Sequence, residues 1–325
     1  MTSFARTFLP ALPPLDYAAE SARIESFMAR AVGRLKRRGV VLGVSGGVDS
    51  AVCAALAARA LGSERVFALL MPERESDDDS VGRAVRLCRR FNIAHAVEDV
   101  TGGLEAIGCY RRRDDAVRRL CPEYGAGWRH KIAIASSAES GIPFFNLVVE
   151  SPNGARAVKR MPADVYLQVV AATNYKQRLR KAVEYFHAER LNHAVVGTPN
   201  RLEYDLGFFV RGGDGLADLK PIAHLYKTQV YALAEHLGIP EEIRSQPPST
   251  NTYSLPQTQE EFFFALPYDK ADLMLHAMTA GIPEETMAAA LGVEPARVRQ
   301  VWRDFAGKRR LAERTLGEAL LVGEG

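Results

Sequence analysis

Residues 40–52 read Val40-Val41-Leu42-Gly43-Val44-Ser45-Gly46-Gly47-Val48-Asp49-Ser50-Ala51-Val52. The apolar run at 40–44 is typical of a central parallel strand that is covered on both faces. Two glycines remove side-chain bulk where the chain then reverses, and the alanine-rich segment 48–61 favours a helix. Unpaired backbone N–H groups at the start of that helix, together with its dipole, attract phosphate. The stretch therefore predicts a polyphosphate site between a buried strand and a helix.

The end of this loop distinguishes it from a Walker-type loop. A Walker loop would end Gly-Lys-Ser/Thr, with a lysine that reaches the outer phosphates, but Asp49 and Ser50 stand at the corresponding positions. A carboxylate would repel bound phosphates unless a metal ion stood between them, so we interpret Asp49 as a Mg²⁺ ligand. The run Ser-Gly-Gly-Val-Asp-Ser at 45–50 resembles the pyrophosphate loop of the ATP pyrophosphatase superfamily, whose members cleave ATP between the α- and β-phosphates. The alternative is a purely structural glycine turn.

The bulk composition limits the possible classes of protein. A chain of 325 residues can bury a sizeable core as one large α/β domain or two smaller ones. The 42 basic and 39 acidic residues, net charge +3, are too evenly balanced to indicate a nucleic-acid partner. Four cysteines show neither a CxxC pair nor metal-ligand spacing. Because apolar runs stay well below the ~20 residues that span a bilayer and no signal-peptide pattern is present, we expect a cytoplasmic protein.

Strand and helix patterns alternate through the first hundred residues. Helical spacing covers 17–38, a second buried strand covers 65–71, and a helix to about residue 91 leads to a third strand at 95–100. This alternation predicts an α/β fold with a doubly wound, mainly parallel sheet flanked by helices. The 45–50 loop would then lie at the carboxyl edge of the sheet, where such folds bind ligands.

An acidic cluster, Ser76-Asp77-Asp78-Asp79-Ser80, stands where the second of these helices should begin. Carboxylates at a helix start can cap backbone N–H groups and are favoured by the dipole. We interpret the cluster as a cap; metal binding is the alternative.

Residues 102–170 break the alternation. The segment is rich in arginine at 110–119 and basic again at 128–131. Its second half reads as a β-hairpin, with strands at 144–150 and 155–160 around the turn Ser151-Pro152-Asn153-Gly154. The basic residues are either a solvated surface or a site for phosphates of a substrate or partner.

Regular α/β sequence resumes with a helix at 173–190 and a strand at 193–197. This strand delivers the run 198–203 to the same edge of the sheet as the first loop. A glycine-rich loop with two carboxylates follows at 208–218, and a helix begins near residue 226.

The last third of the chain reads as helical after the proline-containing loop 246–250. Helices at 283–291 and 296–315, separated by Gly292-Val293-Glu294-Pro295, resemble a helix-turn-helix. A helical hairpin that covers the domain explains the same pattern, and we adopt that interpretation.

Several motifs, in order, resemble the ammonia-dependent NAD synthetase family over about residues 20–100 and 170–310. They are the 45–50 loop, Asn174 to Arg180, Gly197-Thr198 with Asn200 and Glu203, Gly213-Asp214-Gly215 with Asp218, Lys227-Thr228, and Pro248-Ser249. The resemblance implies one synthetase-like domain over 1–325 with an adenine nucleotide alpha hydrolase-like fold, an insertion at 102–170 and a helical extension at 283–325. It also implies a two-step reaction with ATP as substrate and Mg²⁺. The carboxylate of deamido-NAD attacks the ATP α-phosphate, pyrophosphate leaves, and ammonia displaces AMP.

The resemblance also assigns roles to residues. Because a carboxylate and a polyphosphate repel each other, cationic groups must neutralise both before attack. The implied metal ligands are Asp49 and Glu203, from the ends of two neighbouring strands; a helix cap and a surface residue are the respective alternatives. The implied catalytic residues are Asp49, Lys227 and Ser249. The implied ATP-binding residues are Gly43, Ser45, Gly46, Gly47, Val48, Asp49, Ser50, Thr198, Lys227 and Ser249. The implied residues of the deamido-NAD site are Asn174, Arg178, Arg211, Asp214 and Asp218.

Three departures from the family pattern bear on the acceptor half of the site. The usual Gln-Thr-Asp-Glu context reads Gln257-Thr258-Gln259-Glu260, so a loop that orders over the active site loses a carboxylate, and Phe262-Phe263-Phe264 adds aromatic bulk. Pro199 and Leu202 alter the run around Asn200 without removing its functional positions. The 102–170 segment is longer than the family's connection and could reshape the acid-substrate pocket.

The expected partners are small molecules and a second copy of the chain as a homodimer, without a membrane and without nucleic acid. Free ammonia, or a separate glutaminase, would supply nitrogen, because the cysteines lack a nucleophile-type context. Three alternatives stay open: the same ligase chemistry on a different carboxylate, a tRNA-modifying enzyme that shares the loop, and a degenerate synthetase kept as a structural or regulatory subunit.

Overall fold

A computed structural model describes residues 11–77, 79–136, 143–247, 252–264, 266–317 and 322 of the chain. Four strands of the described part form a parallel sheet in the order β3-β2-β1-β7. Their bounds are β1 Val40–Gly43, β2 Val66–Leu70, β3 Ala94–Val97 and β7 Ala194–Val195. Val40 pairs with Val66 on one side and with Ala194 on the other. The parallel pairing confirms the expected α/β class and places the carboxyl ends of β1 and β7 side by side.

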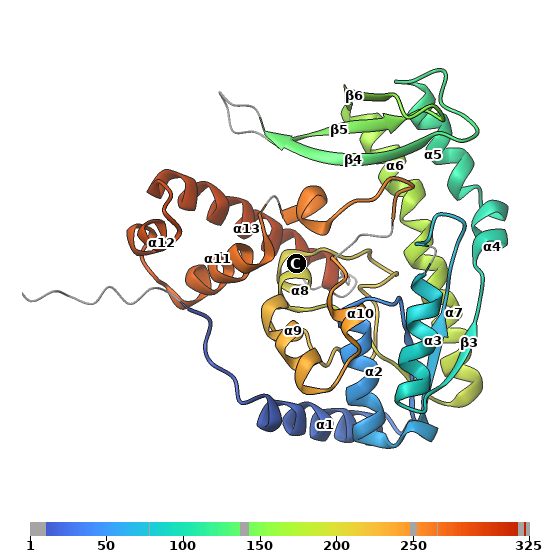
Figure 1. Ribbon diagram of the computed structural model, residues 1–325, viewed down its shortest axis with the longest axis vertical. Helices are drawn as coiled ribbons and strands as arrows, with labels where there is room; N and C mark the ends of the chain where they lie inside the picture. The colour runs from blue at the N-terminus through green and yellow to red at the C-terminus, as the bar shows by residue number, and fades with distance from the viewer. Residues whose placement is uncertain are drawn as a thin grey trace, which may run out of the picture.

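Helices cover both faces of this sheet, as the doubly wound prediction requires (Figure 1). Val40 and Leu42 face a core shared with α1, α2, α3 and α9, whereas Val41 faces α7. Side chains of a strand alternate between faces, so β1 is apolar throughout because it is buried on both sides. The bounds are α1 Tyr17–Arg34, α2 Val48–Leu61, α3 Ser80–Arg90, α7 Tyr175–Leu191, α9 Lys227–His236 and the short α10 Glu241–Arg244.

The acidic cluster precedes α3 as expected, but the capping interpretation is wrong for its described carboxylates. Asp79 occupies the N-cap position without a side-chain hydrogen bond to the helix. Asp77 instead pairs with Arg83, and Asp79 pairs with Arg86 at 3.0 Å. Arg83 and Arg86, about one and two turns into α3, therefore bind these carboxylates in place of the backbone N–H groups at the helix start. Asp78 lies outside the described residues.

The 102–170 segment contains the predicted hairpin and more. Strands β5 Pro143–Glu150 and β6 Arg156–Arg160 form the hairpin, and β4 Arg129–Ser136 pairs antiparallel with β5. This second sheet lies apart from the parallel one, next to α5 and α6 (Figure 1). Helices α4 Thr101–Ala106, α5 Cys109–Arg118 and α6 Ala163–Thr173 complete the segment. Sequence reasoning missed β4 because the basic pair His130-Lys131 hides the alternation that buries His130 and Ile132.

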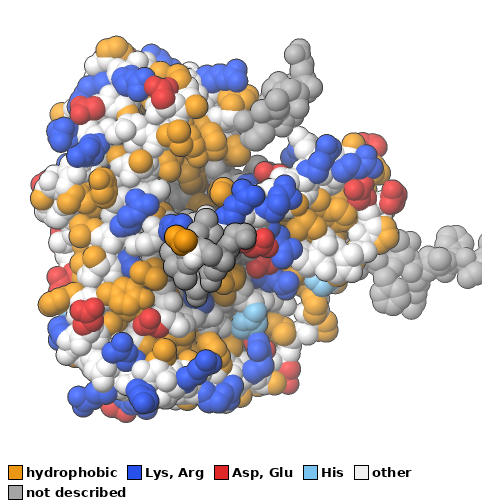
Figure 2. All heavy atoms as spheres, turned by 180° about the vertical axis from the view of Figure 1, so that it is seen from behind, with side chains coloured by type: hydrophobic (Ala, Val, Ile, Leu, Met, Phe, Trp, Pro, Cys, Tyr) orange, Lys and Arg blue, Asp and Glu red, His pale blue; other side chains and the backbone are white. Residues whose placement is uncertain are grey.

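Most of the basic residues in this segment form ion pairs within it. Arg129 and Arg156 both pair with Glu150, and Arg119 pairs with Asp164 at 2.5 Å. On the face in Figure 2, Lys and Arg side chains lie among acidic and apolar ones. These pairings favour the solvated-surface interpretation of the basic stretch over a phosphate site.

A third group of helices lies to one side of the parallel sheet in Figure 1. It consists of α8 Arg201–Leu206, α11 Tyr268–Ala280, α12 Glu284–Leu291 and α13 Pro295–Leu316, around a shared apolar core. The α12–α13 pair packs on α8 and α11 through buried side chains such as Val298 and Phe305. Within the described ranges, no helix combines the length and apolarity needed to cross a bilayer.

Candidate active site

The loop between β1 and α2 leaves the start of α2 open. Gly46 has φ +81°, and a Cβ there would lie 2.6 Å from the Ser80 carbonyl oxygen, so both conformation and space require glycine. The Ser50 hydroxyl donates to the Gly47 carbonyl at 3.0 Å and accepts from the Ser45 N–H at 3.2 Å. Gly47 occupies the N-cap position and has no side chain to cap the helix. The first N–H groups of α2 are therefore available to an anion.

Asp49, in the first turn of α2, meets side chains from two distant helices. The Lys227 ammonium donates to Asp49 Oδ2, and Asn200 Nδ2 lies 3.4 Å from Asp49 Oδ1. The Lys227 side chain is 2% exposed, whereas the Asp49 side chain is 17% exposed. Asp49 accepts from other segments and caps nothing in its own helix, so the helix-cap alternative for Asp49 is wrong.

The Lys227 ammonium is held in a partly aromatic enclosure. It lies 5.7 Å from the ring centre of Tyr231 and 5.5 Å from that of Tyr268. Burial lowers its pKa, but the nearby carboxylates of Asp49 and Glu203 outweigh this effect and raise it above the usual value. Lys227 is therefore a fixed cation next to the open end of α2, which suits it to bind phosphate.

Glu203 is buried, so the surface interpretation of this residue is wrong as well. It forms a capping box with Asn200: Glu203 Oε2 accepts from the Asn200 N–H at 3.1 Å, and the Glu203 N–H donates to Asn200 Oδ1 at 3.2 Å. Burial and the neighbouring Asp49 carboxylate raise the pKa of Glu203 to about 8. A divalent cation between the two carboxylates would remove this repulsion.

The donor set at this place fits magnesium shared with phosphates. Asp49 and Glu203 offer two carboxylates, and the described part of the chain contains no cluster of three or more His, Cys, Asp or Glu side chains that could hold a metal. Mg²⁺ in nucleotide sites takes one or two protein carboxylates and fills its other positions with phosphate oxygens and water. Two carboxylates are therefore enough for a Mg²⁺–nucleotide complex.

Sequence reasoning missed Asp272, which fixes the helix that carries Lys227. Asp272 lies on α11 and is 0% exposed. Its carboxylate accepts from the Lys227 N–H at 3.2 Å and from the N–H and hydroxyl of Thr228, both at 2.8 Å, so it caps α9 from another helix. The signal that could have revealed it is an acidic residue on the apolar side of α11, next to buried Ala271 and Leu275.

Gln259, the departure from the family pattern, lies against this site. The Tyr268 hydroxyl donates to Gln259 Oε1, and the Gln259 amide is close enough to Glu203 to lower the pKa of that carboxyl. An aspartate here would add a third carboxylate beside Asp49 and Glu203. The amide thus avoids further repulsion while keeping a polar contact to Glu203.

The residues predicted for the deamido-NAD site lie along α7 and the loop 208–218. Arg178 Nε donates to the Arg211 carbonyl at 3.2 Å, which brings these two positions together, and Asn174 stands at the junction of α6 and α7. Asp214 Oδ1 accepts from the Val210 N–H at 2.6 Å. Loop and helix therefore share a surface, while the ligand contacts of these residues stay a prediction.

Asp218 Oδ2 accepts from the Val195 N–H at 2.7 Å, so this carboxylate fastens β7 to the loop that follows it. Thr198 is half-buried just after β7, near the carboxyl edge of the sheet. Ser249 lies outside the described residues, so its role also stays a prediction.

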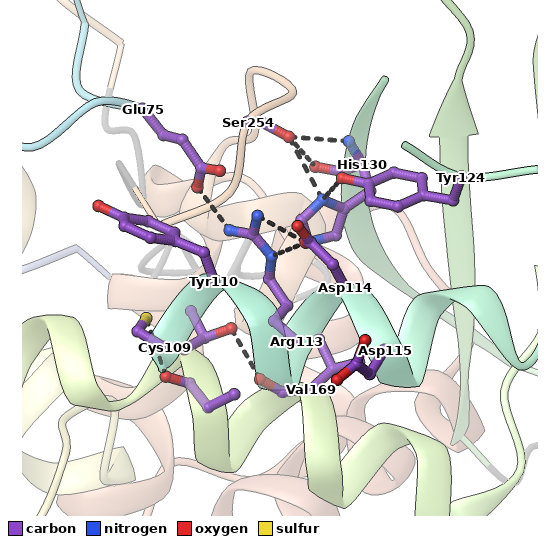
Figure 3. A network of polar contacts seen from close by, with 12 residues as sticks. Glu75, Cys109, Tyr110, Arg113, Asp114, Asp115, Tyr124, His130, Val169 and Ser254 are labelled. Carbon is purple, nitrogen blue, oxygen red and sulfur yellow. Dashed lines mark hydrogen bonds and ion pairs between the residues drawn. The ribbon is translucent and has the colours of Figure 1, made fainter. Parts of the chain in front are cut away.

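A second polar network, which the sequence did not reveal, lies between α5, the loop that follows β2 and the second sheet (Figure 3). Lys176 donates to Glu73 at 2.8 Å and to Glu75 at 2.7 Å, and Arg113 donates to Glu75 at 2.7 Å. Burial raises the pKa of Glu75, but the two cations outweigh it and lower the pKa to about 2. Tyr110 donates to Glu73 at 2.7 Å. These charges are closed off by protein and neutralise one another.

The parallel sheet with a Ser-Gly-Gly-Val-Asp-Ser loop at its carboxyl edge, a buried lysine and two carboxylates defines a nucleotide-binding α/β protein, consistent with the ATP pyrophosphatase type. The chain belongs to the NAD synthase family, whose model matches residues 20–118 and 141–310. The match confirms the resemblance described above, and its gap at 119–140 contains β4.

Named relatives agree with this membership. The chain is 55% identical over 298 residues to the NH(3)-dependent NAD(+) synthetase of Rhizobium rhizogenes, which covers 91% of this chain and 90% of that one. It is 36% identical over 250 residues to the protein of the same name from Thermotoga maritima, covering 77% and 83% of the two chains.

Solved structures show the same fold. The NMN synthetase of Francisella tularensis has a TM-score of 0.66 at 21% identity and covers 95% of this chain and 99% of that one. The NH3-dependent NAD synthetase of Campylobacter jejuni has a TM-score of 0.62 at 22% identity, with 94% and 99% covered.

Proposed function

We propose that this chain is an ammonia-dependent, AMP-forming ligase that makes NAD from deamido-NAD, with ATP as the second substrate. The observation that carries the proposal is the buried Lys227 paired with Asp49 at the open start of α2. It stands in a chain that is 55% identical, over nine-tenths of its length, to a protein named NH(3)-dependent NAD(+) synthetase. The residue roles below are parts of the same proposal.

The reaction has two bond exchanges. A nicotinate carboxylate oxygen forms a bond to the ATP α-phosphorus while the bond from that phosphorus to the bridging oxygen of pyrophosphate breaks. The ammonia nitrogen then bonds to the acyl carbon, AMP leaves with the oxygen, and a proton is released. The chain must supply positive charge in both steps, because carboxylate, triphosphate and leaving groups are all anionic.

The site residues divide this task by their chemistry. Ser45, Gly47 and Ser50, together with the first N–H groups of α2, cradle the departing pyrophosphate. Lys227 neutralises phosphate charge from a fixed position, and Ser249 adds a hydroxyl. Mg²⁺, held by Asp49 and Glu203, supplies Lewis-acid charge at the phosphates when bound.

The remaining predicted contacts belong to the two substrates. Thr198, after β7, lies near the nucleotide. The deamido-NAD site is lined by Asn174, Arg178, Arg211, Asp214 and Asp218. The proximity of Arg178 to the Arg211 carbonyl supports a shared surface for that substrate.

The domain organisation, nitrogen source and assembly complete the proposal. We infer a single synthetase-like domain with an insertion at 102–170, supported by the gap in the family match at 119–140. The glutamine-dependent NAD+ synthetase of Acinetobacter baumannii aligns over 48% of its length with 96% of this chain, which supports free ammonia or a separate glutaminase as the source. We also infer a cytoplasmic homodimer; Leu167 on α6 and Phe186 on α7, both 63% exposed, offer apolar surface to a second copy.

Product analysis tests the function. The purified chain is incubated with ATP, Mg²⁺, ammonium and deamido-NAD, and mass spectrometry should detect NAD, AMP and pyrophosphate in equal amounts. Asp49→Asn should abolish pyrophosphate release, whereas Asp269→Asn, an exposed aspartate in the first turn of α11, should leave it unchanged. Full turnover by Asp49→Asn would refute the assignment of this carboxylate.

Amidation of a carboxylic acid other than deamido-NAD is the alternative function, because the solved NMN synthetase shares the fold. Nicotinic acid mononucleotide should be tested beside deamido-NAD. A higher kcat/KM for the mononucleotide, or ATP–pyrophosphate exchange that does not respond to deamido-NAD, would favour the alternative.

A further inference from the structure

Residues 252–257, here called the strap, run along the free edge of strand β4. The Leu255 N–H donates to the His130 carbonyl at 3.0 Å, and the His130 N–H donates to the Ser254 hydroxyl at 2.9 Å. The Gln257 side-chain amide donates to the Ile132 carbonyl. The opposite edge of β4 is paired with β5. The strap therefore covers an edge that would otherwise expose unpaired backbone groups.

The strap is also buried against the second sheet. Tyr253, Leu255 and Gln257 are 5%, 2% and 4% exposed. The Tyr253 ring belongs to the apolar core of that sheet and meets the His130 ring edge-on, with ring centres 5.6 Å apart. Side chains of the strap and of the sheet thus form one packed unit.

Buried polar groups hold the start of the strap. Lys176, which pairs with Glu75 of the network in Figure 3, also donates to the Thr252 carbonyl at 2.9 Å. His130 is 0% exposed, and its Nδ1 lies 2.8 Å from the Tyr124 hydroxyl and 3.3 Å from the Ser254 hydroxyl. Burial and the nearby Arg113 cation lower the pKa of His130 to about 3, so the imidazole is neutral at physiological pH.

The strap leads directly into the candidate active site. Two residues after Gln257, Gln259 Oε1 accepts from the Tyr268 hydroxyl, and the centre of the Tyr268 ring lies 5.5 Å from the Lys227 ammonium. Strand β4 lies in the part of the chain that the family model does not match. A feature outside the family match thus contacts a segment that reaches the tyrosine beside Lys227.

We propose that β4 anchors the strap, and that His130, Ser254 and Gln257 are positioning residues that hold Gln259 against Tyr268, next to Lys227, during nucleotide turnover. This inference rests on the proposed function. It gives the 102–170 segment a role in the ligase reaction, because the second sheet sets the position of the segment that carries Gln259.

The test uses the full chain with the double substitution Ser254→Ala and Gln257→Leu. The change removes the side-chain bonds of the strap to β4 but keeps its apolar packing. Gln257 Oε1 is buried without a hydrogen-bond partner among the described residues, so leucine also removes an unsatisfied atom and the fold should survive. Ser151→Ala is the matched control, because this hydroxyl lies in the β5–β6 turn, away from the strap.

Three measurements are made on each variant: hydrogen exchange of peptides covering 252–259, the free energy of unfolding in urea, and the kinetics with ATP. In the double variant we expect exchange at least about tenfold faster in those peptides and kcat/KM for ATP about tenfold lower. The Ser151→Ala control should match the unmodified chain in hydrogen exchange and in kcat/KM. In a Gln259→Ala background, the strap substitutions should cause no further fall in kcat/KM.

Each outcome decides the inference. Faster exchange with unchanged kcat/KM, or an equal fall in kcat/KM in the Gln259→Ala background, would show that the strap does not act through Gln259. If the double variant fails to fold, Gln257→Leu alone provides the same comparison. Failure of the unmodified chain to make NAD would overturn the proposed function instead, which separates the two failures.

Discussion

Asp272 offers a demanding test of the site, because it touches the backbone of Lys227 and not its ammonium. Its carboxylate accepts from the N–H groups of Lys227 and Thr228 and from the Thr228 hydroxyl. Asp272→Ala removes these acceptors from the start of α9. Loss of a helix cap costs about 0.5–2 kcal/mol, and the first turn of α9, which carries Lys227, should become less well fixed.

The buried charge of Asp272 itself destabilises the folded chain, by an amount that depends on pH, so removing it offsets part of the lost cap. Burial raises the pKa of Asp272 to about 6 from the usual 3.8, despite the three donors. Between pH 3.8 and pH 6 the Asp272 carboxyl is therefore protonated in the folded chain and ionised in the unfolded chain. The stability that this group contributes is full below pH 3.8 and is lost as the pH rises through 6. A difference of about two pKa units corresponds to about 3 kcal/mol. Near pH 7 this cost offsets the lost cap, so Asp272→Ala should change the free energy of unfolding little there.

The assay combines urea unfolding at pH 5 and pH 7 with kinetics at pH 7. Asp272→Ala should be more destabilised at pH 5 than at pH 7, and its kcat/KM for ATP should fall about tenfold at pH 7 because Lys227 is misplaced. Asp269→Asn, which removes an exposed charge from the same helix, is the control. Equal kinetics for Asp272→Ala and the control would refute the positioning of Lys227 by Asp272.

Two further substitutions test charges inside the protein. Glu203→Gln keeps the capping box, because glutamine can also occupy this position, so the fold should be retained while kcat/KM for ATP falls at least about a hundredfold. Burial and Asp49 raise the pKa of Glu203 to about 8, so the unmodified chain loses stability as the pH rises from 7 to 9. Urea unfolding should therefore show the variant gaining stability relative to the unmodified chain over this range. Glu75 has its pKa lowered to about 2 against the opposing effect of burial, so its stabilisation is present above pH 4.5 and is lost as the pH falls toward 2. Between pH 5 and pH 3 the free energy of unfolding, measured in urea, should fall by about 2 kcal/mol more for the unmodified chain than for Glu75→Gln. Parallel curves of this free energy against pH would contradict the ion-pair explanation.

The sequence predicted the parts of the site that depend on local patterns. The apolar run before Ser45 is typical of a buried strand and the glycines after it indicate a turn, so the helix at Val48–Leu61 was predicted to the residue. Glu203 follows the next buried strand of the sheet and was therefore placed at the same edge. These inferences succeed because a parallel sheet brings the carboxyl ends of its strands together.

The contacts that the sequence did not reveal join segments far apart in the chain. Asp272 meets Lys227 across 45 residues, and Gln257 meets Ile132 across 125. Neither pairing leaves a periodic signal, because each depends on how separate helices and sheets pack. The basic composition around His130 also concealed a strand whose inward-facing residue is a neutral histidine rather than an apolar side chain.

Two of the buried lysines, Lys176 and Lys227, show why one cluster is a candidate site and the other is structural. Lys176 is 1% exposed, and its partners Glu73 and Glu75 are 0% and 10% exposed, so water and ligands have little access to these charges. Lys227 is equally buried, but its partner Asp49 is 17% exposed at the open start of a helix. Separating a buried ion pair without a replacement partner is costly. Of the two, only the Lys227 pair is accessible enough to exchange its partner for an incoming phosphate, and this difference in access, rather than the presence of a buried lysine, supports it as the candidate nucleotide site.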